Sequence, residues 1–215
     1  MTLPPLTDFV ALLGLDLVLT AALVRLVFWR VTSAQSRSAV LVFALIFFLL
    51  MWWPVAAAPL PLLAYVRGVS SDLSVSFVLV AVLGLGHRTG WWQGPGPRER
   101  HALAVALALA ALVLYPTALG WGDADVYRAG WGGLPLGLAL LFVCAIAWWR
   151  GFRLLPMAVA AALIAWSFGL MESTNLWDYL IDPWLAIASI FQCLRCLWCW
   201  LVVKVRSSPA ERPVS

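Results

Sequence analysis

The segment MESTNLWDYLIDPW, residues 171–184, carries three carboxylates and no basic residue between two long apolar runs. Asp182 precedes Pro183, the arrangement expected of a helix N-cap followed by proline at the first helical position. Glu172 instead follows an apolar run expected to be helical, and the negative end of a helix dipole disfavours a carboxylate. We therefore expect Glu172 to be compensated by Arg67, by Arg128 or by open water.

Further polar residues occur in the connections around residues 67–72 and 115–133, and in the motif NLWDYLI. This motif predicts one short interfacial turn that contains Asp178 and is capped by Asn175. Two arginines among carboxylates and aromatics could recognise a lipid headgroup, a phosphate or a partner protein, whereas the plainer interpretation is a hydrated, salt-bridged rim. The candidate ligand- or partner-binding residues are Arg67, Asp123, Asp125, Arg128, Glu172, Asn175 and Asp178.

Three cysteines in FQCLRCLWCW, Cys193, Cys196 and Cys199, are spaced so that they could share one face of a helix. Zinc normally takes four ligands, and no histidine is near them in the sequence. The two histidines, His87 and His101, flank one connection at helix ends, which does not suit a haem held between helices. Cysteine is also an ordinary small apolar residue. We therefore expect neither a metal site nor a cofactor, and no catalytic motif is present.

The composition determines the class of protein that must position these residues. The chain is 64% hydrophobic and 11% charged, whereas soluble domains have about 25% charged residues. Such a surplus of apolar surface requires lipid, and fourteen tryptophans suit a membrane–water boundary. The net charge of +4 comes from short basic clusters beside apolar runs, not from a patch, so we expect no nucleic-acid partner.

The apolar runs predict an all-α, polytopic transmembrane helical bundle with about seven spans. We expect a single domain over residues 1–206 and a short disordered cytoplasmic tail over 207–215. Thr7 with Asp8, and Ser71 with Asp72, are expected to begin the first and third spans as helix caps. The spans are predicted at residues 8–28, 38–58, 71–87, 101–119, 134–149, 154–171 and 183–204.

Charge distribution predicts the orientation of these spans. Basic residues concentrate in the connections 29–37, 88–100 and 150–153 and in the tail, which fall on one side if there are seven spans. The alternate connections hold most of the acids. The positive-inside rule then places the N-terminus outside and the C-terminus in the cytoplasm.

Two features fall within or between the expected spans. Asp16 and Arg195 lie near the midplane of the first and last spans, so we expect an intramembrane ion pair that either locks the two helices together or lines an ion pathway. Pro54, Pro59 and Pro61 predict a kinked or broken end to the second span. The stretch from Pro59 to Val66 is expected to be either interfacial, re-entrant or a plain loop.

The segments AYVRGVSSDLS, YPTALGWGDADVYRAGW and ESTNLWDYLIDPWL resemble an uncharacterised family of multi-pass inner-membrane proteins of Gram-negative bacteria. The resemblance extends from the second span to the last and does not include the cysteine motif. It implies a location in the bacterial inner membrane, but it supplies no catalytic residues.

Three functions are compatible with these observations. The first is a non-enzymatic accessory or assembly component of the cell envelope, in contact with membrane lipids and another envelope membrane protein. The second is a membrane-embedded enzyme that acts on a lipid-linked substrate through periplasmic carboxylates such as Glu172 or Asp178. The third is a transporter for a small solute, with Asp16 and Arg195 along its route.

Overall fold

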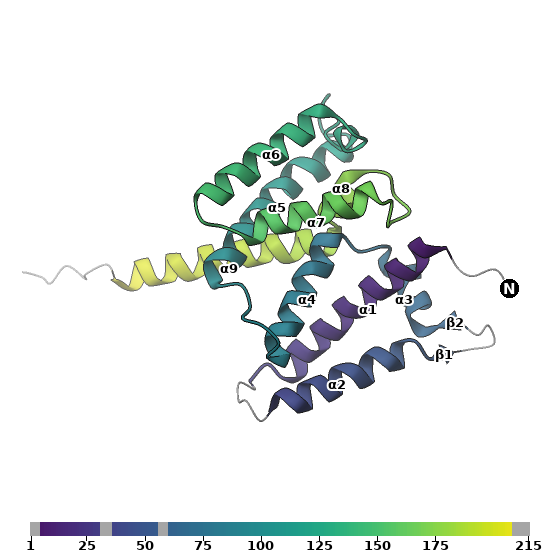
Figure 1. The fold of residues 1–215 in the computed structure, drawn as a ribbon. Coiled ribbons are helices and arrows are strands. Elements are labelled where there is room, and N and C mark those ends of the chain that lie inside the picture. Colours follow the sequence, from purple (N-terminus) through teal and green to yellow (C-terminus); the bar gives the residue numbers. More distant parts are fainter. Residues whose placement is uncertain (1–4, 31–35, 56–59, 208–215) are drawn as a thin grey trace, which may run out of the picture.

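A computed structural model describes residues 5–30, 36–55 and 60–207, and nearly all of this structure is helical (Figure 1). Residues 208–215 of the expected tail lie outside the described residues. The helices are α1 (Leu6–Val27), α2 (Ser36–Met51), α3 (Leu62–Ser70), α4 (Val75–Thr89), α5 (Pro97–Ala118), α6 (Leu134–Trp149), α7 (Leu154–Ser167), α8 (Leu176–Leu180) and α9 (Pro183–Ser207). A two-stranded hairpin, β1 (Pro54–Val55) with β2 (Leu60–Pro61), and a 3-10 helix, η1 (Tyr127–Gly130), complete the described elements.

Each expected span coincides with a helix, but the helices differ in length. Within the described part of the chain, α1, α5 and α9 are long and apolar enough to cross a membrane. The apolar helices α2, α4, α6 and α7 have 14–16 residues each, which is below the usual lower limit of about 17. The structure therefore establishes a largely helical protein with three candidate membrane spans.

Two of the expected boundaries are wrong for identifiable reasons. The helix of the second span ends at Met51 rather than at residue 58, because the chain turns into the β1–β2 hairpin. The helix of the sixth span ends at Ser167 rather than at 171, because Gly169 adopts a left-handed conformation with φ of 60°. Glycine just past the last helical residue is a common helix terminator.

The stretch expected to be interfacial, re-entrant or a plain loop contains the end of the hairpin and the first half of α3. Pro59 lies outside the described residues, Leu60–Pro61 forms β2, and α3 starts at Leu62. Leu63 of α3 is fully buried against Leu15 and Val18 of α1. The hairpin and α3 thus fold back against the first helix.

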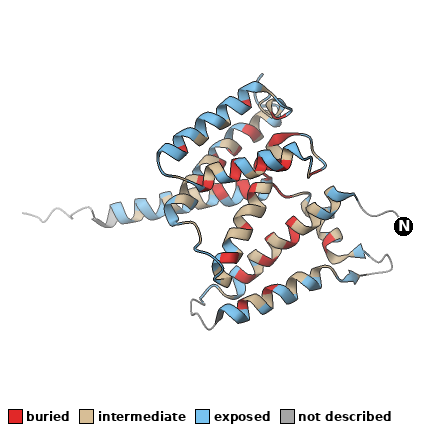
Figure 2. Ribbon diagram, in the orientation of Figure 1, coloured by how far each residue is buried: buried red, intermediate tan, exposed pale blue. Residues whose placement is uncertain are grey.

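The core divides between two groups of helices. In one, α1 packs against α4 and α2; in the other, α5 packs along α9, and α7 contacts α5, α6 and α8. Helix α4 also contacts α7 and so joins the two groups. Figure 2 shows the buried residues gathered where these helices meet, whereas α2, α6 and much of α9 expose most of their surface. These exposed faces are apolar, with Leu45, Phe142 and Leu194 more than half exposed, as expected of helices solvated by lipid.

The connections gather at two ends of the bundle. At one end, the Arg88 guanidinium donates to the Phe28 carbonyl at 3.0 Å, and Glu99 accepts from the backbone N–H of Arg153 at 2.9 Å. At the other end, Arg67 donates to Glu172 at 3.0 Å. This grouping agrees with the alternation of basic and acidic connections in the sequence.

Candidate functional site

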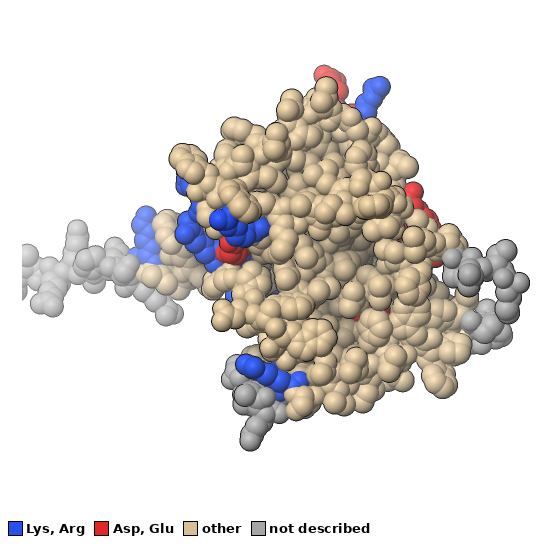
Figure 3. All heavy atoms as spheres, viewed as in Figure 1, with Lys and Arg blue, Asp and Glu red and all other residues tan. Residues whose placement is uncertain are grey.

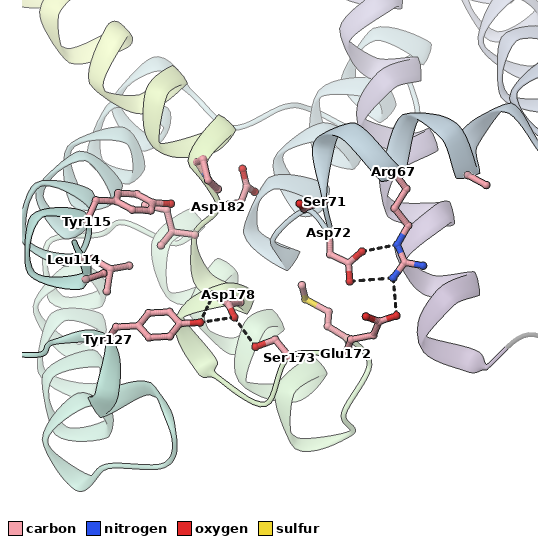
Figure 4. A pocket seen from close by; sticks show the side chains of 16 residues that line it. Arg67, Ser71, Asp72, Leu114, Tyr115, Tyr127, Glu172, Ser173, Asp178 and Asp182 are labelled. Atoms are coloured by element: carbon pink, nitrogen blue, oxygen red, sulfur yellow. Dashed lines mark hydrogen bonds and ion pairs between the residues drawn. The ribbon is translucent and has the colours of Figure 1, made fainter. Parts of the chain in front are cut away.

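Arg67, near the end of α3, is bonded to carboxylates from three other segments. Its Nη1 donates to Asp8 Oδ1 at 2.6 Å, its Nε to Asp72 Oδ1 at 2.6 Å and its Nη2 to Glu172 Oε1 at 3.0 Å. Figure 4 shows the guanidinium between Asp72 and Glu172. The bond from Asp72, with smaller contributions from Asp8 and Glu172, raises the pKa of Arg67 above its ordinary value, so the group remains a cation.

Glu172 therefore has the cation that the sequence led us to expect, and the cation is Arg67. The expectation that Glu172 lies at the negative end of a helix is wrong, because α7 ends at Ser167 and Glu172 lies five positions beyond the helix. Glu172 is also the weakest of the three partners, since its side chain is 62% exposed while that of Asp72 is 20% exposed. Asp72 is thus the main structural partner of Arg67.

A strained backbone turn brings Asp72 back to Arg67. Ser71 follows α3 with φ of 60° and ψ of −173°, and among the described residues it has the one positive φ that is not at glycine. This region is strongly disfavoured for residues with a Cβ. Asp72 consequently pairs with Arg67 and does not cap α4 as expected; Ser74 is the cap, with its Oγ accepting from the Phe77 N–H at 3.2 Å.

Asp178 lies on α8 and is held by two hydroxyl groups. The Tyr127 hydroxyl of η1 donates to Asp178 at 2.9 Å, and the Ser173 hydroxyl donates to the same carboxylate. Burial, the bond to Asp178 and the charge of that carboxylate raise the pKa of Tyr127 to about 12. The phenol therefore remains a hydrogen-bond donor at any physiological pH.

Asn175 confirms the expected capping of the short turn. Its Oδ1 accepts from the Trp177 N–H at 2.9 Å, and the helix that follows is α8. The same amide also joins two loops, because its Nδ2 donates to the Tyr127 carbonyl at 3.0 Å. The indole of Trp177 donates to the Val126 carbonyl at 3.0 Å. These hydrogen bonds hold the loop after α5 against the loop after α7.

Asp182 is a helix cap, as predicted, and has a second role. Its Oδ1 accepts from the Leu185 N–H in the first turn of α9 at 2.8 Å. Its Oδ2 accepts from both the N–H and the hydroxyl of Ser74, at 2.9 and 2.6 Å. This buried carboxylate therefore ties the start of α9 to the start of α4.

Several of these groups line a cavity of about 770 Å³ at the end of the bundle that carries the acidic connections (Figure 4). The charged residues among its lining are Arg67, Asp72, Glu172, Asp178 and Asp182. Four carboxylates face one guanidinium, which gives the cavity a formal surplus of three negative charges. Tyr115 and Tyr127 also line it, and the Tyr115 hydroxyl makes no hydrogen bond to any of the described residues. The cavity therefore offers negative charge and a Tyr115 hydroxyl that is free to bond a ligand.

The other residues expected in this site lie outside it. Asp123, Asp125 and Arg128 are exposed in the loop after α5 and do not line the cavity. Asp125 accepts from the backbone N–H of Arg128 at 3.1 Å, so it caps a turn. Tyr115 and Ser173, which line the cavity, and Ser74, which bonds Asp182, were not expected, because single hydroxyl residues have no distinctive sequence pattern.

The intramembrane ion pair expected between Asp16 and Arg195 is not formed among the described residues. Asp16 is fully buried and accepts instead from the Trp52 indole N–H at 2.7 Å and from the Thr20 hydroxyl at 3.3 Å. Arg195 is exposed on α9. The expectation failed because depth in the membrane does not determine which face of a helix carries a residue.

The cysteines of α9 have a histidine neighbour that their sequence context did not suggest. The Sγ of Cys196 lies 3.8 Å from Nδ1 of His101 on α5. Within the described ranges, no three His, Cys, Asp or Glu side chains are placed to hold a metal ion. The four cysteines, including Cys144, are free thiols.

No protein family, no curated protein and no solved structure matches this chain.

Proposed function

We propose that this chain is a multi-pass protein of the bacterial inner membrane with seven spans, its N-terminus outside and its C-terminus in the cytoplasm. Exposed tryptophans near both ends of the bundle support two membrane interfaces. They include Trp53, Trp121 and Trp131 beside the acidic connections, and Trp29 and Trp149 beside the basic ones. Figure 3 shows most of the visible basic side chains near the ends of α2 and α9 and the turn after α6. Helices shorter than the hydrocarbon thickness are accommodated by local thinning of the bilayer.

The protein acts as a non-enzymatic accessory or assembly component of the cell envelope. Its outer, acid-lined cavity binds a positively charged group of a membrane partner. One observation carries this proposal: each carboxylate lining the cavity is already committed to a structural bond inside the chain. Rigid carboxylates in this arrangement attract a cation without being free for proton transfer or nucleophilic attack.

The charge of the cavity opposes the alternative of phosphate recognition. The arginine within reach, Arg67, is surrounded by Asp8, Asp72 and Glu172, and Arg128 does not line the cavity. An anion would have to displace carboxylates from Arg67 while lying near the remaining acids. Binding of an amine or a guanidinium is favourable instead, since the cation neutralises the surplus negative charge of the cavity.

A second candidate is a membrane enzyme in which Asp178 acts on a lipid-linked substrate. The observation in its favour is that Asp178 and Tyr127 form a hydrogen-bonded pair at the cavity wall, with the unbonded Tyr115 hydroxyl also lining the cavity. The transporter has no comparable support, because Asp16 is bonded to Trp52 and Thr20 and is not paired with Arg195.

The decisive experiment is purification of the full chain in mild detergent, followed by identification of bound membrane proteins by mass spectrometry. We expect a partner that remains with the wild type and with D123N, a matched charge change outside the cavity, but that is weakened by D178N. An enzyme would instead lose function in a deletion-complementation assay with D178N while it stays folded and keeps its partner. Equal retention of the partner by D178N and D123N would contradict the proposed cavity contact.

Orientation is tested separately with a cysteine introduced at Thr174, which is exposed in the loop before α8. The four native cysteines are first replaced. An impermeant thiol reagent should label this position in intact spheroplasts. Protection from the reagent, with labelling only after the membrane is opened, would overturn the proposed orientation.

A further inference from the structure

A second hollow, separate from the acid-lined cavity, opens toward the end of α4. A groove of about 240 Å³ runs between α1, α2 and α4. Its lining includes Thr20 of α1, Leu41 and Leu45 of α2, Leu85 and Thr89 of α4, and Trp92 just after α4. The groove is smaller than pockets for drug-sized ligands, which are about 300–1,000 Å³, and its size fits part of one hydrocarbon chain.

The surface that lines the groove is almost entirely hydrocarbon. Its two hydroxyl groups are both bonded internally: Thr20 donates to Asp16, and Thr89 donates to the Leu85 carbonyl at 3.1 Å. The indole N–H of Trp92 donates to the Leu83 carbonyl at 3.2 Å. A polar ligand would find no partner here, whereas an acyl chain loses nothing by entering.

Two arginines, one on α2 and one on α4, lie close to residues that line this groove. Arg37 lies one turn before the lining residue Leu41 on α2, and Arg88 one turn after Leu85 on α4, so both are on the faces of their helices that line the groove. The Arg37 guanidinium approaches Gly90, where its Nη1 lies 2.9 Å from the position a Cβ would take. Arg88 reaches across to the Phe28 carbonyl at the end of α1.

These arginines have no acidic partner in the part of the chain that the structure describes, where every ion pair involves Arg67. Arg25, on the last turn of α1, lies three residues before Phe28, whose carbonyl Arg88 contacts, so these two cations are neighbours and repel each other. Like charges held together at a membrane surface are stabilised by an anion. The partly negative end of α4 offsets only a fraction of this charge.

From the apolar groove and the unpaired arginines at its mouth, we propose that the bundle binds one anionic phospholipid, with an acyl chain between α1, α2 and α4 and its phosphate at Arg37, Arg88 and Arg25. Basic pockets between transmembrane helices are suited to anionic headgroups. The site depends on the protein lying in a membrane but not on the ligand of the acid-lined cavity. Its headgroup end belongs to the cytoplasmic leaflet in the proposed orientation.

The test is lipid binding by the full chain in detergent, followed by native mass spectrometry and thermal unfolding. The probes are phosphatidylglycerol, phosphatidylcholine with the same acyl chains, and inorganic phosphate. We expect phosphatidylglycerol to be retained and to raise the unfolding temperature, phosphatidylcholine to have a much smaller effect, and phosphate alone to have none. An equal effect of phosphatidylcholine would overturn charge recognition, and an equal effect of phosphate would overturn the role of the acyl chain.

Variants locate the site. R37Q should weaken phosphatidylglycerol binding about fivefold, the loss expected for one basic residue near an anionic surface. R150Q is the matched control, because Arg150 is exposed at the end of α6, a helix that contributes no residue to the groove. Equal affinities of R37Q and R150Q would place the lipid elsewhere. L45W narrows the groove from an exposed position and should therefore weaken the binding of phosphatidylglycerol. Inorganic phosphate should have no effect on this variant, as on the wild type.

Discussion

Arg67 and Glu172 are 105 positions apart in the sequence, yet Nη2 of the arginine lies 3.0 Å from Oε1 of the glutamate. This ion pair joins the segment after the β1–β2 hairpin to the loop after α7. Both residues line the acid-lined cavity, so the pair closes one side of it. Because Glu172 is well exposed, it is also the partner that Arg67 can release at the lowest cost.

The three carboxylates around Arg67 should differ in their contribution to stability. We expect E172Q to lower the free energy of unfolding by less than about 1 kcal/mol, as for other exposed ion pairs. D72N should cost about 1–3 kcal/mol, because Asp72 is 20% exposed and makes two bonds to the guanidinium. Denaturant or thermal unfolding in detergent measures these changes. Combining each variant with R67Q in a double-mutant cycle gives the coupling of Arg67 to Glu172 and to Asp72. Equal couplings would refute this ranking.

Gly130 should be essential for docking the loop after α5 against the loop after α7. A Cβ at this position would lie 1.7 Å from Oδ1 of Asn175, the atom that caps α8. G130A should therefore destabilise the protein by at least about 2 kcal/mol, since it overpacks the site and breaks the cap. G137A is the control, because a Cβ there has no neighbour within 4 Å and alanine favours a helix. Comparable unfolding temperatures for the two variants would show that the loops do not pack as described.

Ser71 should be a site where glycine stabilises the protein. Its φ of 60° with extended ψ is costly for any residue with a Cβ, and glycine adopts it freely. We expect S71G to raise the free energy of unfolding by about 1 kcal/mol, whereas S71A retains the Cβ and should not. If the two variants prove equally stable, strain at this turn is not significant.

The tyrosine–carboxylate pair should have a signature at high pH. The pKa of Tyr127 rises from 10.0 to about 12 in the folded protein. A raised folded-state pKa contributes stability that is fully present below pH 10 and is lost as the pH rises through 12, because the unfolded chain releases its proton first. Between pH 10 and 12, the free energy of unfolding should fall more for the wild type than for Y127F. Y65F, at a tyrosine 42% exposed, is the control and should behave as the wild type.

The sequence alone was sufficient for features that depend on local rules. The helical class and the approximate helix positions follow from the long apolar runs, which are typical of helices that cross a membrane. The caps at Asp182 and Asn175 were predictable because a cap bonds to backbone only two or three residues away. The helix end before Gly169 follows an equally local rule, because glycine just past the last helical residue ends many helices.

The tertiary structure decided which side chains meet. Glu172 could have been paired with Arg67 or Arg128, and the folding of α3 against α1 selects Arg67. Asp16 was expected to meet Arg195, but the rotation of α1 turns it toward Trp52. His101 and Cys196, 95 residues apart, become neighbours only because α5 packs along α9. The hydropathy pattern predicts how deep in the membrane a residue lies. Which side chain it meets depends instead on helix rotation and packing, and these are set by contacts between segments distant in the sequence.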